Sequence, residues 1–177
     1  CKTLATAIRQ RMHKAEEAYN LMAYEQAEKR YDRLLRRALD RTALIHCADA
    51  CRRQNELDAA AIRYHQADSI APLTGEDAFR YGQVLMGTGD ERTAESFFFR
   101  VLQERPEDAP SLDLYGSCQG YAAFLRDSNA FVVNGLNLPG FKSVFSAVPF
   151  EKGLLVTGEP ASARGRANPW NGRSFLD

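Results

Sequence analysis

Apolar residues recur three and four positions apart through residue 126, which is the spacing of helices that bury one face. Ala15, Ala18 and Met22 show this spacing near the start of the chain. Asp40 stands where a helix N-cap is expected, and Pro72 stands where a helix must end. The pattern predicts helices over residues 6–22, 24–39, 41–54, 57–70, 75–86, 91–104 and 109–126.

A fixed period runs through these predicted helices. Four kinds of residue recur at this interval: Ala60 and Ala94, Tyr64 and Phe98, Pro72 and Pro106, and Tyr81-Gly82 and Tyr115-Gly116. The interval resembles the tetratricopeptide (TPR) repeat of about 34 residues, in which helix pairs stack into an array. The resemblance implies a mostly α fold with three TPR helix-turn-helix repeats and a capping helix, which together form a TPR domain over residues 6–127.

Small residues and cysteines occupy matching places in this period. Ala48, Gly82 and Gly116 are equivalent, so we expect each of them where a neighbouring helix approaches closely. Cys47 and Cys51 share a helix face, which fits either half of a metal site or two core positions. Because they stand in the register of Tyr81 and Leu85, we predict core cysteines and no metal site.

A TPR array binds its partners on a face lined mainly by the first helix of each repeat. Eight residues are expected to line it: Tyr19, Ile45, Asp49, Arg52, Arg53, Phe79, Gln83 and Met86. Their mixture of aromatic, apolar and charged side chains suits an extended peptide or a partner helix. Arg52 and Arg53 fit either recognition of an acidic partner or simple solvation.

Composition narrows the class of function. The chain has 177 residues, with 23 basic and 23 acidic side chains and a formal net charge of zero, so no global field attracts nucleic acid. No apolar run approaches the roughly 20 residues that span a bilayer. No phosphate loop, metalloprotease motif or nucleophile elbow occurs, so we expect a protein that is not an enzyme and has no cofactor.

A second basic stretch lies on and after the predicted helix over residues 24–39. It contains Lys29, Arg30, Arg33, Arg36, Arg37 and Arg41. These side chains could contact lipid head groups. The alternative, which we favour from the sequence, is a solvated face paired with Glu25, Glu28 and Asp32.

The first residue, Cys1, resembles the lipid-modified cysteine of a mature bacterial lipoprotein. The alternative is a chain that simply starts at this residue. Lipidation implies an anchor and linker over residues 1–5. The acidic run typical of surface export is missing after Cys1, which favours the periplasmic face of the outer membrane.

From Ala130 onward the pattern changes to short β-prone runs. They are Phe131–Val133, Ser143–Val148 and residues 153–157, and a polar stretch over residues 159–168 reads as a long loop. Such short strands are not stable alone, so we expect them to pair with a partner chain or with further sequence. Trp170, Phe175 and Leu176 offer apolar anchors at the end.

The order of motifs over residues 128–177 resembles the first blade of a PD40-type, WD40-like β-propeller. The motifs are Val133–Asn137, Phe145–Pro149, Leu154–Val156, Trp170–Gly172 and Phe175–Asp177, although Thr157-Gly158 replaces the usual Ser. Together with Cys1 and the TPR period, they resemble Bacteroidota lipoproteins that combine TPR repeats, a propeller and an OmpA-like peptidoglycan-binding domain. That resemblance spans the whole chain.

The resemblance implies a scaffold that contacts other protein subunits and tethers the type IX secretion and gliding machinery to peptidoglycan. Peptidoglycan would be bound only by domains outside this chain, and the membrane through lipidated Cys1. The alternative is an accessory subunit of an outer-membrane protein insertion (β-barrel assembly) complex.

Overall fold

The computed structural model describes residues 2–161 and 168–170, and it divides into two compact units. The first unit contains the chain as far as Ser128, together with Pro169 and Trp170. The second contains the described residues from Asn129 to Asn168. The first unit is helical and the second carries a small antiparallel sheet, so the predicted mostly α fold with a β-containing tail is confirmed.

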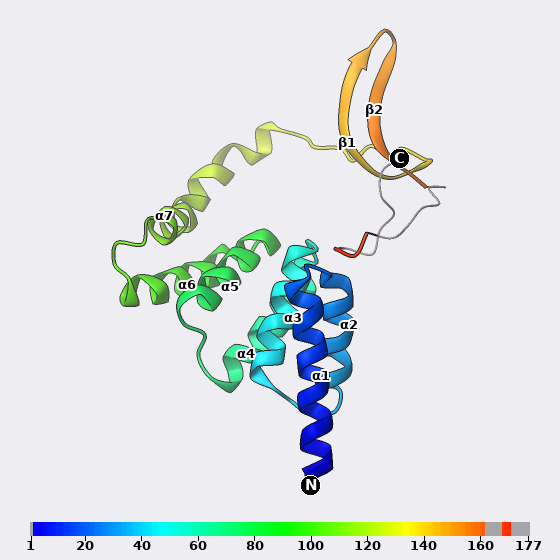
Figure 1. Cartoon of the computed structure of the whole chain (residues 1–177). Helices are drawn as coiled ribbons and strands as arrows, with labels where there is room; N and C mark the ends of the chain where they lie inside the picture. The colour runs from blue at the N-terminus through cyan, green and yellow to red at the C-terminus, as the bar shows by residue number, and fades with distance from the viewer. Residues whose placement is uncertain (1, 162–167, 171–177) are drawn as a thin grey trace. The chain divides into compact units, whose positions relative to one another are not determined.

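Within the described residues, the first unit is built from seven α-helices in which each packs against the next along the chain (Figure 1). They are α1 (Lys2–Asn20), α2 (Tyr24–Leu35), α3 (Arg41–Arg53), α4 (Leu57–Ile70), α5 (Gly75–Thr88), α6 (Glu91–Glu104) and α7 (Ala109–Phe124). Helix α3 also contacts α1 and α5, which places the first helices of successive pairs side by side. A short 3-10 helix, Leu125–Ala130, follows α7.

The helix starts repeat with the period of the sequence. Helices α3, α5 and α7 begin one full period apart, as do α4 and α6, whereas α2 begins one position less than a full period before α4. The N-caps explain part of this regularity, because the carboxylates of Asp40, Asp90 and Asp108 each accept a hydrogen bond from a backbone N–H of the first helical turn. Local capping chemistry therefore sets the helix boundaries that the sequence predicts.

The core of the first unit consists of side chains at the predicted inward positions. Tyr31, Tyr64 and Phe98 are fully buried on the second helices of the three pairs. Cys47 and Cys51 are buried on α3, which confirms them as core residues. Polar and charged residues take the remaining helix faces, as an amphipathic helix requires.

The two glycines of the Tyr-Gly pairs differ in their surroundings. A Cβ atom added to Gly82 would lie 2.7 Å from the ring of Phe98, so close approach at Gly82 is confirmed. A Cβ atom added to Gly116 would meet no described heavy atom within 4 Å. The prediction of close packing at Gly116 is therefore wrong, because in the described chain no further α-helix follows α7 to cover it.

The second unit contains a two-stranded antiparallel hairpin formed by β1 (Phe141–Phe150) and β2 (Gly153–Pro160). The strands pair with each other from Phe150 and Gly153 outward, with two register shifts. The strands thus find a first partner in each other, since the connection between them is short enough for a hairpin. The need for a further partner stays a prediction, because a two-stranded hairpin is marginally stable alone. No strand forms over Phe131–Val133 in the described chain, and these three side chains are largely exposed.

A search of the described helices finds none with both the length and the apolar character that a bilayer crossing requires.

Candidate functional site

A buried carboxylate organises the face on which α1, α3 and α5 meet. Asp49, on α3, is only 1% exposed. Its Oδ1 accepts hydrogen bonds from Arg52 Nε and Nη2 at 2.8 and 2.6 Å, and its Oδ2 accepts one from Arg53 Nε at 2.7 Å. The hydroxyl of Tyr19, on α1, donates to the same Oδ2. One carboxylate thus links two helices and holds both arginines at the end of α3.

The charge on Asp49 is stabilised by these donors. Burial alone would raise the pKa of Asp49, but hydrogen bonds from Tyr19, Arg53 and Arg52 outweigh it and hold this pKa at about 2. Burial, together with the hydrogen bond to Asp49, raises the pKa of Tyr19 to about 12. The cluster therefore keeps a negative carboxylate and a neutral phenol over the physiological pH range.

A third arginine adds positive charge to this cluster. Arg80, on α5, lies with Nη1 3.9 Å from Asp49 Oδ1, and its Nε donates to Glu76 at 3.0 Å. Asp49 and Glu76 together balance two of the three guanidinium groups formed by Arg52, Arg53 and Arg80. The face consequently carries an excess of one positive charge within this group.

The predicted lining residues are only partly brought together. Tyr19, Asp49, Arg52 and Arg53 form one network, in which Asp49 and its neighbour Ile45 are buried. Of the residues on α5, Phe79 and Met86 pack partly against the core, and Gln83 is exposed. Arg52 and Arg53 are neither simply solvated nor free, because Asp49 holds both, which the sequence analysis did not anticipate.

Aromatic rings extend the network on its α1 side. The ring of His46 stacks on Tyr19, with centroids 5.5 Å apart, and His46 Nδ1 shares a 3.2 Å hydrogen bond with the hydroxyl of Tyr31. Tyr24 meets Tyr19 edge to face. The guanidinium of Arg53 lies 5.1 Å from the centroid of the Tyr24 ring, a cation–π contact. These contacts help to fix the position of Arg53 at this face.

Trp170 adds a residue from the far end of the chain to this unit. Its indole Nε1 donates to the carbonyl of Arg53 at 2.8 Å, and its own carbonyl accepts from the backbone N–H of Glu25 at 3.2 Å. Its ring meets Tyr24 edge to face, with centroids 4.6 Å apart. Trp170 thus satisfies one free carbonyl at the end of α3 and one free N–H at the start of α2, where Ala23 supplies no side-chain cap.

Sequence reasoning missed Arg80, Tyr24 and the place of Trp170. The sequence did hold a signal for Arg80, because it follows the acidic residue Asp49 by a little less than one period. The same arrangement pairs Asp32 with Arg63 and Asp68 with Arg100. No comparable signal places Trp170, which the sequence marked only as an apolar anchor.

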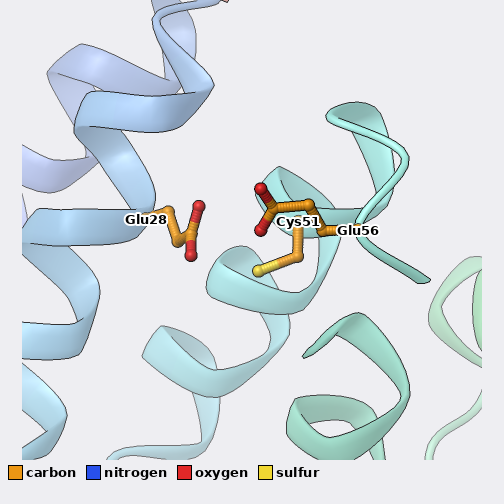
Figure 2. A group of neighbouring side chains, drawn as sticks. All are labelled: Glu28, Cys51 and Glu56. Carbon is orange, nitrogen blue, oxygen red and sulfur yellow. The ribbon is translucent and has the colours of Figure 1, made fainter. Parts of the chain in front are cut away.

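A second cluster lies between α2, α3 and the start of α4. Figure 2 shows Glu28, Cys51 and Glu56 converging, and one ligand atom from each lies within 4.8 Å of the others. A hydrogen bond with Cys47, together with burial, raises the pKa of the Cys51 thiol, and burial raises the pKa of Glu28 despite the 2.8 Å hydrogen bond from Gln54. These shifts favour protonated groups, and structural zinc sites use four ligands. We assign no metal to the cluster.

The chain was compared with known proteins. No protein-family model matches it, and no curated protein matches its sequence.

Proposed function

We propose that the helical unit is a non-enzymatic TPR scaffold that docks a protein partner on the face formed by α1, α3 and α5. The recurrence of helix starts once per period is the single observation that carries this proposal. The contacts of α3 with both α1 and α5 support it, because first helices that lie side by side create a continuous surface.

The chemistry of the face favours an acidic or amphipathic protein segment. Arg52 and Arg53 are held in place by Asp49 but keep a quarter to a third of their side-chain surface exposed, at 25% and 32%. Partly exposed Tyr19, Phe79 and Met86 add apolar area near them. Fixed cations beside apolar area suit a partner that offers carboxylates and an apolar surface, since little side-chain entropy is lost on binding.

The wider proposal rests on the resemblance to Bacteroidota lipoproteins. Under this wider proposal, Cys1 carries the lipid that anchors the protein to the periplasmic face of the outer membrane. Cys1 lies outside the described residues. The TPR unit then connects subunits of the type IX secretion machinery, the tail begins a β-propeller, and domains outside this chain bind peptidoglycan. Replacing Cys1 by Ser should release the protein from the membrane fraction, and unchanged retention in detergent-free extracts at high salt would contradict the anchor.

The docking proposal is tested by placing a negative charge on the proposed face, which should repel an acidic partner. Gln83 is exposed on α5 and Gln26 is exposed on α2, so Gln83→Glu and Gln26→Glu add the same charge at different places. Capture of the partner from envelope extracts should be weakened by Gln83→Glu alone, while both variants keep the wild-type melting temperature. Equal capture by the two variants would contradict docking on this face.

The identity of the captured subunits tests the wider proposal. Recovery of type IX secretion components with the protein would support the proposal that it tethers this machinery to peptidoglycan. Subunits of an outer-membrane protein insertion complex, recovered without secretion components, would contradict it and favour the assembly role.

A further inference from the structure

A pocket lined entirely by basic side chains lies between α1 and the end of α2. Its volume is about 460 Å³. Two lining residues come from α1 and four from α2 or the residues just after it: Arg11, Lys14, Arg30, Arg33, Arg36 and Arg37. The pocket uses none of the residues of the proposed protein-docking face.

These six cations lack acidic partners. In the part of the chain that the structure describes, none of their nitrogen atoms lies within 4.0 Å of a carboxylate oxygen. Six positive charges around one small volume repel one another, and a bound anion would relieve that repulsion.

The acidic residues of α2 are engaged elsewhere. Glu25 pairs with Lys29, and Asp32 pairs with Arg63 at 2.5 Å. Glu28 accepts the 2.8 Å hydrogen bond from Gln54. The pairing with Glu25, Glu28 and Asp32 that we favoured from the sequence is therefore wrong for Arg30, Arg33, Arg36 and Arg37, although the last three are exposed to solvent as expected.

The other two residues of the basic stretch do not line the pocket and have partners of their own. Lys29 is held by Glu25, and Arg41 donates to the carbonyls of Ala71 and Pro72 at 3.3 and 3.1 Å. In their place α1 contributes Arg11 and Lys14, which the sequence analysis did not connect with the stretch. A hydrogen bond of 2.5 Å from Arg30 Nη1 to the backbone carbonyl of Lys14 joins the two walls of the pocket.

We propose that this pocket binds two or more phosphate groups at once, carried by one compact anion or by neighbouring lipid head groups. Guanidinium groups bind phosphate through paired, charge-assisted hydrogen bonds, and five of the six lining residues are arginines. The volume of about 460 Å³ lies within the usual range of about 300–1,000 Å³ for small-molecule sites. A compact polyphosphate or the phosphate-bearing head groups of lipids have this chemistry.

The test compares two variants of the full chain that lose the same charge. Arg33→Gln/Arg36→Gln/Arg37→Gln removes three exposed pocket residues. Lys29→Gln/Arg92→Gln/Arg126→Gln removes three exposed cations that do not line the pocket. Circular dichroism and thermal melting should show that both variants fold, because neither changes a buried side chain.

Calorimetric titration with tripolyphosphate is the first arm. We expect the wild type to bind tripolyphosphate, and we expect the affinity of the pocket variant to be about tenfold lower because charge-assisted hydrogen bonds are lost. The affinity of the control variant should stay within about twofold of the wild type. Sedimentation with phosphatidylcholine vesicles, with and without phosphatidylglycerol, is the second arm. Each basic residue near an anionic membrane is worth about a fivefold factor, so the pocket variant should bind anionic vesicles roughly a hundredfold less than the wild type.

The two arms distinguish the source of the phosphate. Binding of tripolyphosphate without selective binding of anionic vesicles identifies a free polyanion, and pocket-dependent binding of anionic vesicles identifies lipid head groups. Equal weakening in the pocket and control variants, or no wild-type binding of either probe, would overturn the proposal.

Discussion

Helices α5 and α7 carry the same Tyr-Gly pair in the same register but occupy different environments. Each has a Tyr-Gly pair seven and eight positions after its N-cap, yet Tyr81 is 4% exposed and Gly82 abuts the ring of Phe98, whereas Gly116 meets nothing within 4 Å. Helix α6 covers α5, and α7 has no following helix pair in the described chain. Helix starts therefore follow the period of the sequence, whereas burial of a given position depends on whether another helix packs over it.

The rest of α7 shows the same difference. Leu112, Tyr121 and Phe124 are 47, 36 and 79% exposed, although α7 packs against α6. Its N-cap Asp108 is formed as in the earlier helices. Helix α7 thus covers the end of the preceding pair and leaves its own apolar surface open.

The largest expected effect on stability is at the position that follows the small residue of each period, which is Asp49 on α3. Asp49, Gln83 and Ser117 are one period apart, but only Asp49 is buried and paired with arginines. Asp49→Asn should lower the free energy of unfolding by about 3 kcal/mol, because it leaves Arg52 and Arg53 without their counter-charge. Ser117→Ala, at the exposed equivalent on α7, should change it by less than about 0.5 kcal/mol. Urea denaturation at pH 7 measures both.

The pH dependence of the same variants gives a second readout. The pKa of Asp49 is about 2 in the folded protein, below its ordinary value of 3.8, so its contribution is present above about pH 4 and is lost as the pH falls toward 2. Stability should therefore fall more steeply over this range in the wild type and in Ser117→Ala than in Asp49→Asn. Parallel acid profiles for all three proteins would contradict the role given to Asp49.

The glycine pair gives the next largest difference. Gly82→Ala should destabilise the protein by about 1–3 kcal/mol, because the new methyl group meets the Phe98 ring at 2.7 Å. Gly116→Ala should stabilise it by about 0.5–1 kcal/mol, because alanine is the better helix former and the site is open. Thermal melting of the two variants should therefore shift in opposite directions, and shifts of the same sign would contradict the difference in packing.

The smallest expected effect concerns a hydroxyl group in the interior of the array. Tyr64 Oη is buried without a hydrogen-bond partner in the described chain, and the residue one period later is Phe98. Tyr64→Phe should raise the free energy of unfolding by about 1 kcal/mol, because it removes an unsatisfied polar group. Tyr31→Phe is the control and should lower it by about 1 kcal/mol, since the Tyr31 hydroxyl bonds to His46. A loss of stability in Tyr64→Phe would indicate that this hydroxyl is satisfied in solution.

Local signals account for what the sequence predicted well. Asp40 caps the helix that it was expected to start, and the β-prone runs after residue 140 lie in β1 and β2. The run Phe131–Val133 forms no strand because β propensity alone supplies no pairing partner. Helix boundaries moved by a few residues, most at the start of α1, which begins at Lys2 instead of residue 6, and at the end of α2, which stops at Leu35 instead of residue 39.

The candidate site could be predicted only in part, because partner choice is a tertiary property. The sequence placed Asp49 and its two arginines on one face, but it could not show that the carboxylate is buried under them. It assigned Asp32 to the neighbouring basic stretch, whereas the fold brings Arg63 from α4 to it. That exchange is what leaves the basic pocket without a counter-charge.

The contact of Trp170 makes the hairpin unit an insertion within the helical unit in terms of chain connectivity. The chain leaves the helical unit after Ser128 and rejoins it at Pro169 and Trp170, so the intervening segment is closed into a loop. The entropy of closing such a loop grows only with the logarithm of its length, so one tryptophan with two hydrogen bonds can fasten it at modest cost. A protease cut inside this loop would remove that advantage, because Trp170 would then have to hold a separate fragment, so the fragment that carries Trp170 should be released after the cut.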